Sequence, residues 1–292
     1  MTVDVLPDGR RRPGGTALYS ALQAARLGLE ATIVTRGREA ELQELLAPFS
    51  DELALVVEPA TATTTLQTSG SGEQRRQRML AWAGPMQPYD DPEAPARWAS
   101  GAAPPDTILH LAPVAAELTA RPAGDWRFAG LTPQGLLRVW AGVEAEVSQQ
   151  ALPTEAVALF EQCGAVVLSR QERPACEAGL EVARRGGALV AVTAGPAATL
   201  LLAGPARAPV EISVPAVRAP VDDLGAGDVY AAALFVALAE GSGPERATAF
   251  AAAAAALRLG SPGPQAIAGR REIEAQAASA AASSPLSSSG SS

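Results

Sequence analysis

The residues with the clearest chemical potential lie between 216 and 241, in the segment AVRAPVDDLGAGDVYAAALFVALAEG. Asp222 and Asp223 precede a Gly-Ala-Gly turn, and Asp228 follows it at the start of an apolar stretch that predicts a helix to about Glu240. The first N–H groups of a helix have no acceptor within the helix, and the helix dipole adds positive potential there. The turn therefore predicts a binding site for an anion such as phosphate.

Glycine at 225 and 227 leaves the backbone of this turn open to a phosphoryl group. A carboxylate at the same place would repel phosphate, which suggests that Asp228 has a different task. It would accept the proton of an attacking hydroxyl group. The structural alternative is a helix cap preceded by glycines that only form a turn, and the G-x-G-D motif by itself does not decide between the two.

Composition excludes several other classes of site. The 292 residues carry 31 acidic and 23 basic side chains, a net charge of −8 that disfavours nucleic acid or an anionic membrane as a partner. Every basic residue is Arg, so a Lys Schiff base and a Lys-bearing phosphate loop are excluded. His110 is the only histidine, and we expect it to be a hydrogen-bonded residue at a strand end. Cys163 and Cys176 indicate unpaired thiols of a reducing compartment.

Targeting and membrane segments are not apparent. The first residues, MTVDVLPDGRRRPGG, have no apolar run, so they do not form a signal peptide. The longest uncharged stretch, 186–206, is interrupted by Gly and Pro, and its halves predict two strands joined by a turn. We therefore expect a cytoplasmic protein. The sequence leaves open whether its N-terminus is complete.

Apolar, strand-like runs alternate with helical patterns along most of the chain. This order predicts an α/β fold, a doubly wound and mainly parallel sheet with helices on both faces. The Thr-rich, then alternating segment 61–83 predicts a β-hairpin or flap outside the wound core. We expect one domain at 1–274, a loop at 90–105 and a disordered tail at 275–292. The expected strands are 31–36, 53–58, 107–112, 165–170 and 188–193, and the expected helices are 16–27, 39–46, 133–143, 153–163 and 174–185.

Two motifs resemble the signatures of one family. V-D-D-L-G-A-G-D resembles the second signature of the ribokinase-like (pfkB) carbohydrate kinases, usually D-T-x-G-A-G-D. GGTALYSALQAARLG at 14–28 resembles the first, a Gly-Gly pair followed by a helix that ends in A-x-L-G. The resemblance covers about 2–274. It implies a ribokinase-like fold and an ATP-dependent kinase that phosphorylates a hydroxyl group of a small sugar, polyol or nucleoside, with Mg²⁺ and potentially K⁺.

The resemblance also implies roles for individual residues. Asp228 matches the catalytic base, and the anion hole matches Gly225, Ala226 and Gly227. The family positions that contact the substrate correspond to Asp4, Gly14 and Gly15, and Glu117, after the strand at 107–112, is a further candidate for such a contact. The positions beside the nucleotide correspond to Thr193 and Gly195, together with Gly225 and Gly227. Glu172 matches the residue that orders Mg²⁺ through water, and Asp222 lies near the family's monovalent-cation loop, with 263–265 on its other side.

The chain also departs from the family pattern. Ser169 stands where N-x-x-E has Asn, and Tyr19 falls near a substrate-binding Asn of sugar kinases. Only ten residues separate Asp4 from Gly14, so we expect no lid strand pair there and a reduced lid built mainly from 61–83. The lid arginines Arg75, Arg76 and Arg78 would either clamp a phosphate or form a solvated basic turn.

The reduced lid and the missing Asn keep an alternative function open, a non-catalytic ligand-binding pseudokinase on the same fold. A dinucleotide-dependent oxidoreductase is disfavoured because no G-x-G-x-x-G follows the first strand. The expected partners are a small-molecule substrate and ATP, with neither nucleic acid nor membrane. Pairing of lid strands leaves both a monomer and a homodimer open.

Overall fold

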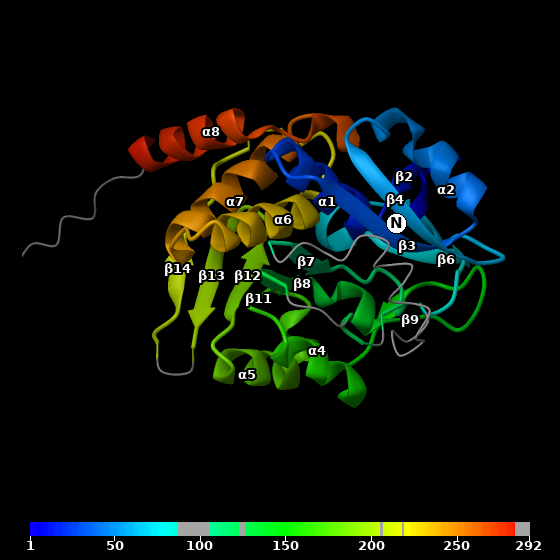
Figure 1. The fold of residues 1–292 in the computed structure, drawn as a ribbon, viewed down its shortest axis with the longest axis horizontal. Coiled ribbons are helices and arrows are strands. Elements are labelled where there is room, and N and C mark those ends of the chain that lie inside the picture. Colours follow the sequence, from blue (N-terminus) through cyan, green and yellow to red (C-terminus); the bar gives the residue numbers. More distant parts are fainter. Residues whose placement is uncertain (87–105, 119, 123–125, 205–206, 218, 284–292) are drawn as a thin grey trace, which may run out of the picture.

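A six-stranded, mostly parallel sheet forms the centre of the molecule (Figure 1). The computed structural model describes residues 1–86, 106–118, 120–122, 126–204, 207–217 and 219–283; the loop expected at 90–105 lies outside them. The strand order is β14-β13-β12-β11-β8-β7, in which β7, β8, β11 and β12 are parallel, β13 runs antiparallel to β12, and β14 runs antiparallel to β13. The strands are β7 (Ile108–Leu111), β8 (Phe128–Leu131), β11 (Ala165–Ser169), β12 (Leu189–Ala194), β13 (Ala197–Ala203) and β14 (Val210–Ile212).

Successive side chains of the central strands enter two different hydrophobic clusters. On β11, Val166 and Leu168 pack toward one face of the sheet, whereas Ala165 and Val167 pack toward the other. The same alternation holds on β12. Strands that are buried on both faces need apolar residues at every position, which explains the continuous runs AVVLS and LVAV.

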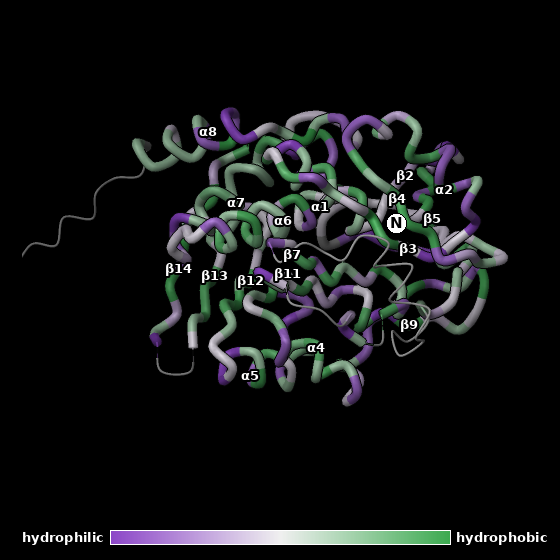
Figure 2. Tube along the Cα trace, in the orientation of Figure 1, coloured by the Kyte–Doolittle hydropathy of each residue, from purple (hydrophilic) through white to green (hydrophobic). Residues whose placement is uncertain are grey.

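Helices cover both faces of this sheet, as the sequence predicted (Figure 1). One face is covered by α4 (Val157–Glu161) and α5 (Glu177–Arg185), and the other by α6 (Ala226–Ala239) and α7 (Pro244–Arg258). The strands between these two layers are largely hydrophobic (Figure 2). Against α6 and α7 lie α1 (Thr16–Arg26) and α8 (Arg270–Ser283). Buried residues follow one another from Val229 to Ala237, because α6 lies between the sheet and other helices.

A second, four-stranded sheet carries the lid. Its order is β2-β1-β5-β6, with β1 (Thr2–Val5), β2 (Arg11–Gly14), β5 (Thr65–Ser69) and β6 (Arg76–Ala81). The β5–β6 hairpin lies in the segment predicted to form one. The expectation that no strand pair fits between Asp4 and Gly14 is wrong. β1 and β2 pair there, with Asp4 opposite Arg12, because the Gly9 N–H donates to the Leu6 carbonyl and closes a tight turn.

Two smaller pairs of strands complete the sheets. The parallel strands β3 (Ala31–Gly37) and β4 (Leu53–Pro59) are joined through α2 (Glu39–Leu46) and the short 3-10 helix Ala47–Phe49. The antiparallel strands β9 (Arg138–Val139) and β10 (Ser148–Gln149) lie close to the lid. The remaining 3-10 helices are Gly72–Gln74, Pro133–Leu137, Thr154–Ala156, Arg173–Cys176 and Pro264–Ala266.

Three segments differ from the sequence prediction. The helix expected at 133–143 is a 3-10 turn followed by β9, because the N–H of Gly135 donates to the Pro113 carbonyl and its carbonyl accepts from the Ala116 N–H instead of bonding within a helix. Strand β8 was not predicted, yet it lies between β7 and β11. The tail is helical up to Ser283, where α8 ends, so the expected disorder is wrong for 275–283; residues 284–292 lie outside the described part.

The apolar stretch 186–206 contains β12 and β13, in agreement with the prediction of two strands. Among the described residues, no helix combines the length and the apolar character that a membrane crossing requires. Cys163 and Cys176 are free, buried thiols, and burial raises the pKa of each to about 12. The cytoplasmic location stays a prediction.

Candidate active site

Two helices begin at the same place in the fold. α1 starts at Thr16 after Gly15, and α6 starts at Ala226 after Gly225; both glycines have positive φ angles, 84° and 79°. The hydroxyl group of Ser20 on α1 donates a 3.2 Å hydrogen bond to the carbonyl oxygen of Asp228 on α6. The two helices are thereby held with their positively polarised ends close together.

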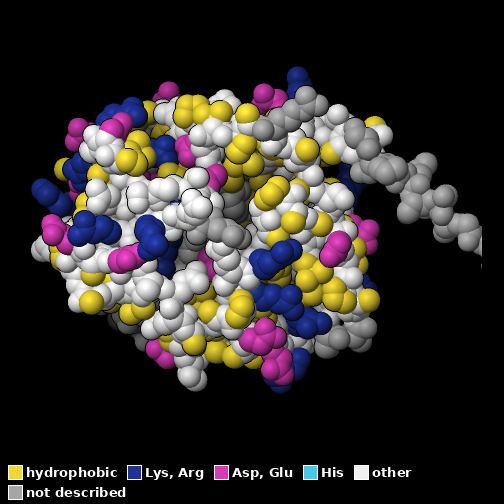
Figure 3. Space-filling view, turned by 180° about the vertical axis from the view of Figure 1, so that it is seen from behind, with side chains coloured by type: hydrophobic (Ala, Val, Ile, Leu, Met, Phe, Trp, Pro, Cys, Tyr) yellow, Lys and Arg dark blue, Asp and Glu magenta, His cyan; other side chains and the backbone are white. Residues whose placement is uncertain are grey.

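A cleft of about 140 Å³ opens at these two helix starts. It brings together five of the predicted site residues, from two distant parts of the sequence: Asp4, Gly15, Gly225, Gly227 and Asp228. The other residues that line the cleft are Thr2, Thr16, Tyr19, Leu66, Arg75, Gln77, Val114, Gln134, Arg138, Asp223 and Leu224. The face of the molecule turned away from the viewer in Figure 1 is hollowed near its centre, with arginine side chains around the hollow (Figure 3).

The glycines of the α6 turn have different surroundings. A Cβ atom on Gly225 would lie 2.3 Å from the ring of Tyr19, and the φ angle of 79° also favours glycine. Nothing lies within 4 Å of the corresponding position on Gly227, so that residue borders open space. Ala226 is the first residue of α6, and its N–H makes only a long, 3.4 Å hydrogen bond to the carbonyl of Asp223. Tyr19 thus packs against Gly225, whereas the Cβ position of Gly227 faces open space in the cleft.

Asp228 is partly buried in the first turn of α6. This burial raises the pKa of Asp228 to about 6, although a hydrogen bond from Thr16 and the nearby Arg138 guanidinium both favour the charged form. A carboxylate with this pKa is mostly ionised at neutral pH and can still take up a proton, which suits a general base.

Asp4 lies on β1 and is 5% exposed. Its carboxylate accepts a 3.3 Å hydrogen bond from the Thr2 hydroxyl, and burial raises its pKa against the opposing charge of Arg12. Gly14 lies against this carboxylate, since a Cβ atom there would be 2.2 Å from Oδ2. The two glycines of the pair therefore have different roles. Gly14 leaves room for the Asp4 carboxylate, and Gly15 lines the cleft.

Sequence reasoning missed the buried arginine of this cleft. Arg138, 9% exposed, donates to the carbonyl oxygen of Val114 and to Oε1 of Gln77, both at 2.7 Å. It takes part in none of the salt bridges among the described residues, and burial lowers its pKa, although a guanidinium remains protonated. The incorrect helix expected at 133–143 concealed it. Gln134, from the same segment, also lines the cleft.

The lid arginines divide into two groups. Arg75 lines the cleft and forms a salt bridge with Asp223. Arg76 pairs with Glu146 in an exposed salt bridge, and Arg78 donates to the carbonyl oxygen of Glu144. Only the first of the three predicted candidates is therefore placed to meet a ligand in this cleft.

Five other predicted residues do not line the cleft, and one of them, Asp222, pairs with Arg12 and Arg258. Glu117 accepts hydrogen bonds from the N–H groups of Val114 and Ala115 and stabilises that turn. Glu172 is buried, accepts a 2.7 Å hydrogen bond from the Ser169 N–H and acts electrostatically on Asp228. Thr193 lies near the end of β12 and Gly195 follows in the turn to β13.

The acidic residues near the cleft fit Mg²⁺ only with a phosphate ligand. No three His, Cys, Asp or Glu side chains in the described part of the chain are grouped so as to hold a metal ion. Mg²⁺ is often bound by one or two carboxylates together with substrate phosphates and water. Glu172 and Asp228 match that limited protein contribution, because their carboxylates are close enough to affect each other electrostatically.

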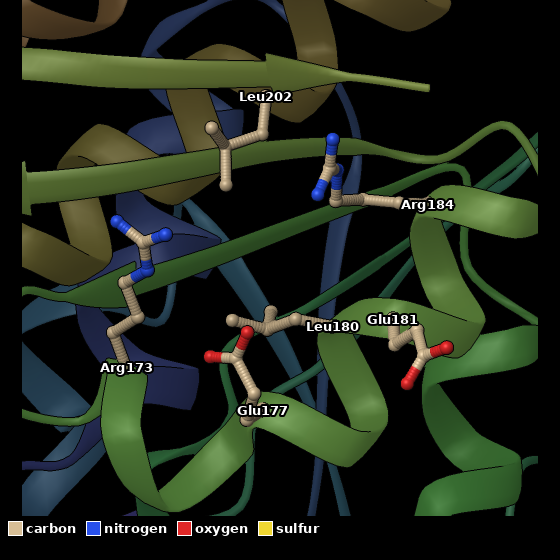
Figure 4. A pocket seen from close by; sticks show the side chains of 6 residues that line it. All are labelled: Arg173, Glu177, Leu180, Glu181, Arg184 and Leu202. Atoms are coloured by element: carbon tan, nitrogen blue, oxygen red, sulfur yellow. The ribbon is translucent and has the colours of Figure 1, made fainter. Parts of the chain in front are cut away.

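A second cavity, of about 120 Å³, lies between α5 and β13 (Figure 4). It is lined by Arg173, Glu177, Leu180, Glu181, Arg184 and Leu202. None of these residues lines the first cleft, and neither helix start reaches it. The predicted chemistry therefore belongs to the cleft at Asp228.

Comparison with protein families agrees with this geometry. Residues 153–269 match the model of the pfkB family of carbohydrate kinases. The match confirms the resemblance to the pfkB carbohydrate kinases. It includes the α6 turn and Asp228, and at the level of the family it confirms the prediction of a carbohydrate kinase. No curated protein matches the chain.

Solved structures show that the chain has the ribokinase-like fold. The fructokinase from Vibrio cholerae O395, solved with fructose, ADP and calcium ion, is similar with a TM-score of 0.71 at 20% identity, over 94% of this chain and 95% of that one. The ribokinase from Thermotoga maritima has a TM-score of 0.67 at 20% identity, over 94% and 96%. A pyrophosphate-dependent kinase of the ribokinase family, solved with a pyrophosphate analog and myo-inositol, has a TM-score of 0.69 at 18% identity, over 94% and 97%.

Proposed function

We propose that this protein transfers the γ-phosphoryl group of ATP to a hydroxyl group of a small sugar, polyol or nucleoside. One observation carries the proposal: the Asp228 carboxylate and the glycine turn at 225–227 face the same cleft as Asp4. A base and an anion site that share one cleft are what transfer to a hydroxyl group requires.

The reacting end of the cleft lies at the start of α6. The acceptor hydroxyl donates a hydrogen bond to the Asp228 carboxylate, which takes its proton as the oxygen attacks the γ-phosphorus in line; the bond from that phosphorus to the β,γ-bridging oxygen breaks, and ADP leaves. The N–H groups of Gly225, Ala226 and Gly227 then face the charge that develops on the transferred group, and the α6 dipole adds to their effect. Thr16 and Arg138 keep Asp228 ionised at neutral pH.

The other end of the cleft supplies side chains for a polyhydroxylated acceptor. Asp4 accepts hydrogen bonds, Arg138 donates them, and the amides of Gln77 and Gln134 do both. These side chains are held on β1, β6 and β9 and in the 3-10 turn before β9, so the acceptor would lie between the lid sheet and the α6 turn. Such a set suits a compound with several hydroxyl groups.

The donor side is assigned to the carboxyl end of the central sheet. Our candidates for contacts with the nucleotide are Thr193, near the end of β12, and Gly195, in the turn that follows it. Glu172 would order the water shell of Mg²⁺, and the bound ion would neutralise part of the charge on the donor phosphates. Pyrophosphate is the donor to test beside ATP, because a kinase that depends on it is among the similar structures.

The test measures phosphate transfer from ATP and from pyrophosphate to a panel of sugars, inositols and nucleosides. With the best pair, Asp228→Asn should lower kcat by roughly 10²–10⁴-fold and leave nucleotide affinity unchanged. Asp51→Asn, on an exposed turn, is the matched control and should have wild-type turnover. Tight binding of one compound without transfer from either donor would select the pseudokinase instead.

A further inference from the structure

Arg258, the last residue of α7, has no exposed surface at all. It follows the run AFAAAAAAL, where the other side chains are small or apolar. A guanidinium keeps its charge in such surroundings, so burying it is costly unless several acceptors surround it. Its contacts therefore indicate what this charge does.

Four hydrogen bonds hold the Arg258 guanidinium between two loops. One terminal nitrogen donates to the carbonyl oxygens of Asp222 and Ser261, at 3.3 and 2.8 Å. The other donates to Oδ2 of Asp222 and to the carbonyl oxygen of Leu224, at 3.0 and 2.7 Å. Carbonyl and carboxylate oxygens that converge on one positive charge are also the donor set of a bound alkali cation.

Asp222 lies between two guanidinium groups. Arg12 also pairs with its carboxylate, at 3.1 Å, and is itself opposite Asp4 in the β1–β2 pair. Burial acts to raise the pKa of Asp222, but hydrogen bonds from Gly263, Leu224 and Arg258 hold it at about 2. The ion pair between Asp222 and the Arg258 guanidinium is therefore present throughout the neutral pH range.

The cluster lies directly behind the α6 turn. Leu224, whose carbonyl oxygen accepts from Arg258, is followed by Gly225, the residue at the helix start. On the other side, the centre of the guanidinium group lies 5.3 Å from the ring centroid of Tyr19, which packs against Gly225. Arg258 thus supports the turn from two sides.

We propose that Arg258 is a built-in cation: its guanidinium takes the place of a bound K⁺ or Na⁺ and positions the 222–225 turn. The expectation of a monovalent cation at Asp222 accordingly does not fit this chain, because the guanidinium already fills the space between these oxygens. The inference depends on the proposed function only for its kinetic consequence. Its consequence for the stability of the turn is independent of any activity.

The first experiment uses the wild-type protein in KCl, NaCl and tetramethylammonium chloride at equal ionic strength. Tetramethylammonium is too large to enter a site of this kind, so a requirement for a small cation would be visible as a difference between the salts. We expect the melting temperature to be the same in all three, and turnover to agree within about twofold. A saturable requirement of the wild type for K⁺ or Na⁺, in stability or in turnover, would overturn the inference.

The second experiment removes the guanidinium. Arg258→Ala should have a lower melting temperature in tetramethylammonium chloride, and KCl or NaCl should raise it with saturation. Turnover should fall roughly tenfold or more and recover in part with the same salts. Arg258→Lys restores a positive charge and should show no salt preference. The matched control is Arg270→Ala at the first residue of α8, which breaks hydrogen bonds to Leu27 after α1 and Glu240 after α6 and should lower stability equally in every salt.

Three results for the variants would contradict the inference. Arg258→Ala with wild-type stability and turnover in tetramethylammonium would show that no cation is needed behind the turn. A destabilised Arg258→Ala that responds equally to all salts would show a packing role only. If that variant is insoluble, Arg258→Lys decides: a salt preference in it contradicts the built-in cation, and its absence supports it. The melting temperature separates these results from a failure of the kinase proposal, which would affect only turnover.

Discussion

The backbone N–H of Gly72, at the tip of the lid hairpin, donates a 2.7 Å hydrogen bond to the carboxylate of Asp223, in the turn before α6. The other oxygen of this carboxylate pairs with Arg75 of the same hairpin. Residues 151 positions apart therefore close the lid over the α6 turn. The structure thus links the lid directly to the site at which we expect phosphoryl transfer.

This link predicts a specific loss in Asp223→Ala. Both the salt bridge and the Gly72 contact disappear, so the lid should close less often, and KM should rise about 3–10-fold with a smaller change in kcat. The pair is partly exposed, so the melting temperature should change little. Steady-state kinetics and a thermal melt test this. Arg76→Ala, which breaks only the exposed pair with Glu146, is the control, and equal KM values in the two variants would refute the link.

The two glycines of the α6 turn predict opposite outcomes. Gly225→Ala places a methyl group 2.3 Å from the ring of Tyr19 at a φ angle of 79°, and should destabilise the protein by about 2–4 kcal/mol. Gly227→Ala meets no atom within 4 Å, so it should fold normally but project a methyl group into the cleft. Its turnover should fall on the order of 10–100-fold. Chemical denaturation together with activity measurements separates the two, and normal turnover in Gly227→Ala would exclude the anion hole.

The parallel core was predictable because its signal is local. Strands such as β11 and β12 are buried on both faces and show it as unbroken apolar runs, and the helices between them show it as helical spacing. β8 was missed because its four residues, FAGL, are too few to show a period, and its place beside β11 depends on pairing across distant sequence. The β1–β2 pair was excluded wrongly because the length of a turn depends on its backbone geometry.

The residues of the site divide in the same way, into those with a local sequence signal and those without one. Asp228, Gly225, Gly227 and Asp4 were found from motifs, and the structure places them in one cleft. Arg138 and Arg258 were not found. The hydrogen-bond acceptors of Arg138 are distant in sequence, at Val114 and Gln77, and three of the four hydrogen bonds of Arg258 go to the loop at 222–224. A lone Arg at the end of an Ala-rich helix was the only visible signal of the second.

The contacts of Arg138 predict that it acts through hydrogen-bond geometry as well as charge. Arg138→Lys keeps the charge but cannot donate to both Val114 and Gln77, so one buried acceptor loses its partner at a cost of about 1–3 kcal/mol. We expect kcat/KM for the acceptor to fall roughly tenfold or more, with unchanged affinity for the donor. Arg78→Lys is the control on the exposed side of the lid. An equal loss of affinity for both substrates would contradict a role on the acceptor side.

The pKa of Asp228 predicts opposite pH dependences for activity and stability. Because the base must be ionised, kcat/KM should rise with pH around a midpoint near 6. Because burial raises this pKa from 3.8 to about 6, the folded state holds the proton more tightly than the unfolded state does. The bound proton therefore stabilises the folded state. This contribution to the free energy of unfolding, up to about 3 kcal/mol, is fully present below the unfolded-state pKa of 3.8 and is lost as pH rises through the folded-state pKa of about 6. Asp228→Asn removes the charge and should be more stable than the wild type at pH 7, with a difference that vanishes toward pH 4.

Thr16→Val provides the sharpest check of this assignment. The Thr16 hydroxyl favours the ionised form of Asp228, so its removal should move the midpoint of the activity profile to higher pH while leaving the limiting rate in alkali similar. Activity profiles between pH 5 and 9 and denaturation curves at pH 4 and 7 measure both effects. A midpoint that does not respond to Thr16→Val would assign the titration to another group. Asp4 is the first alternative, since burial raises its pKa as well and it lines the same cleft.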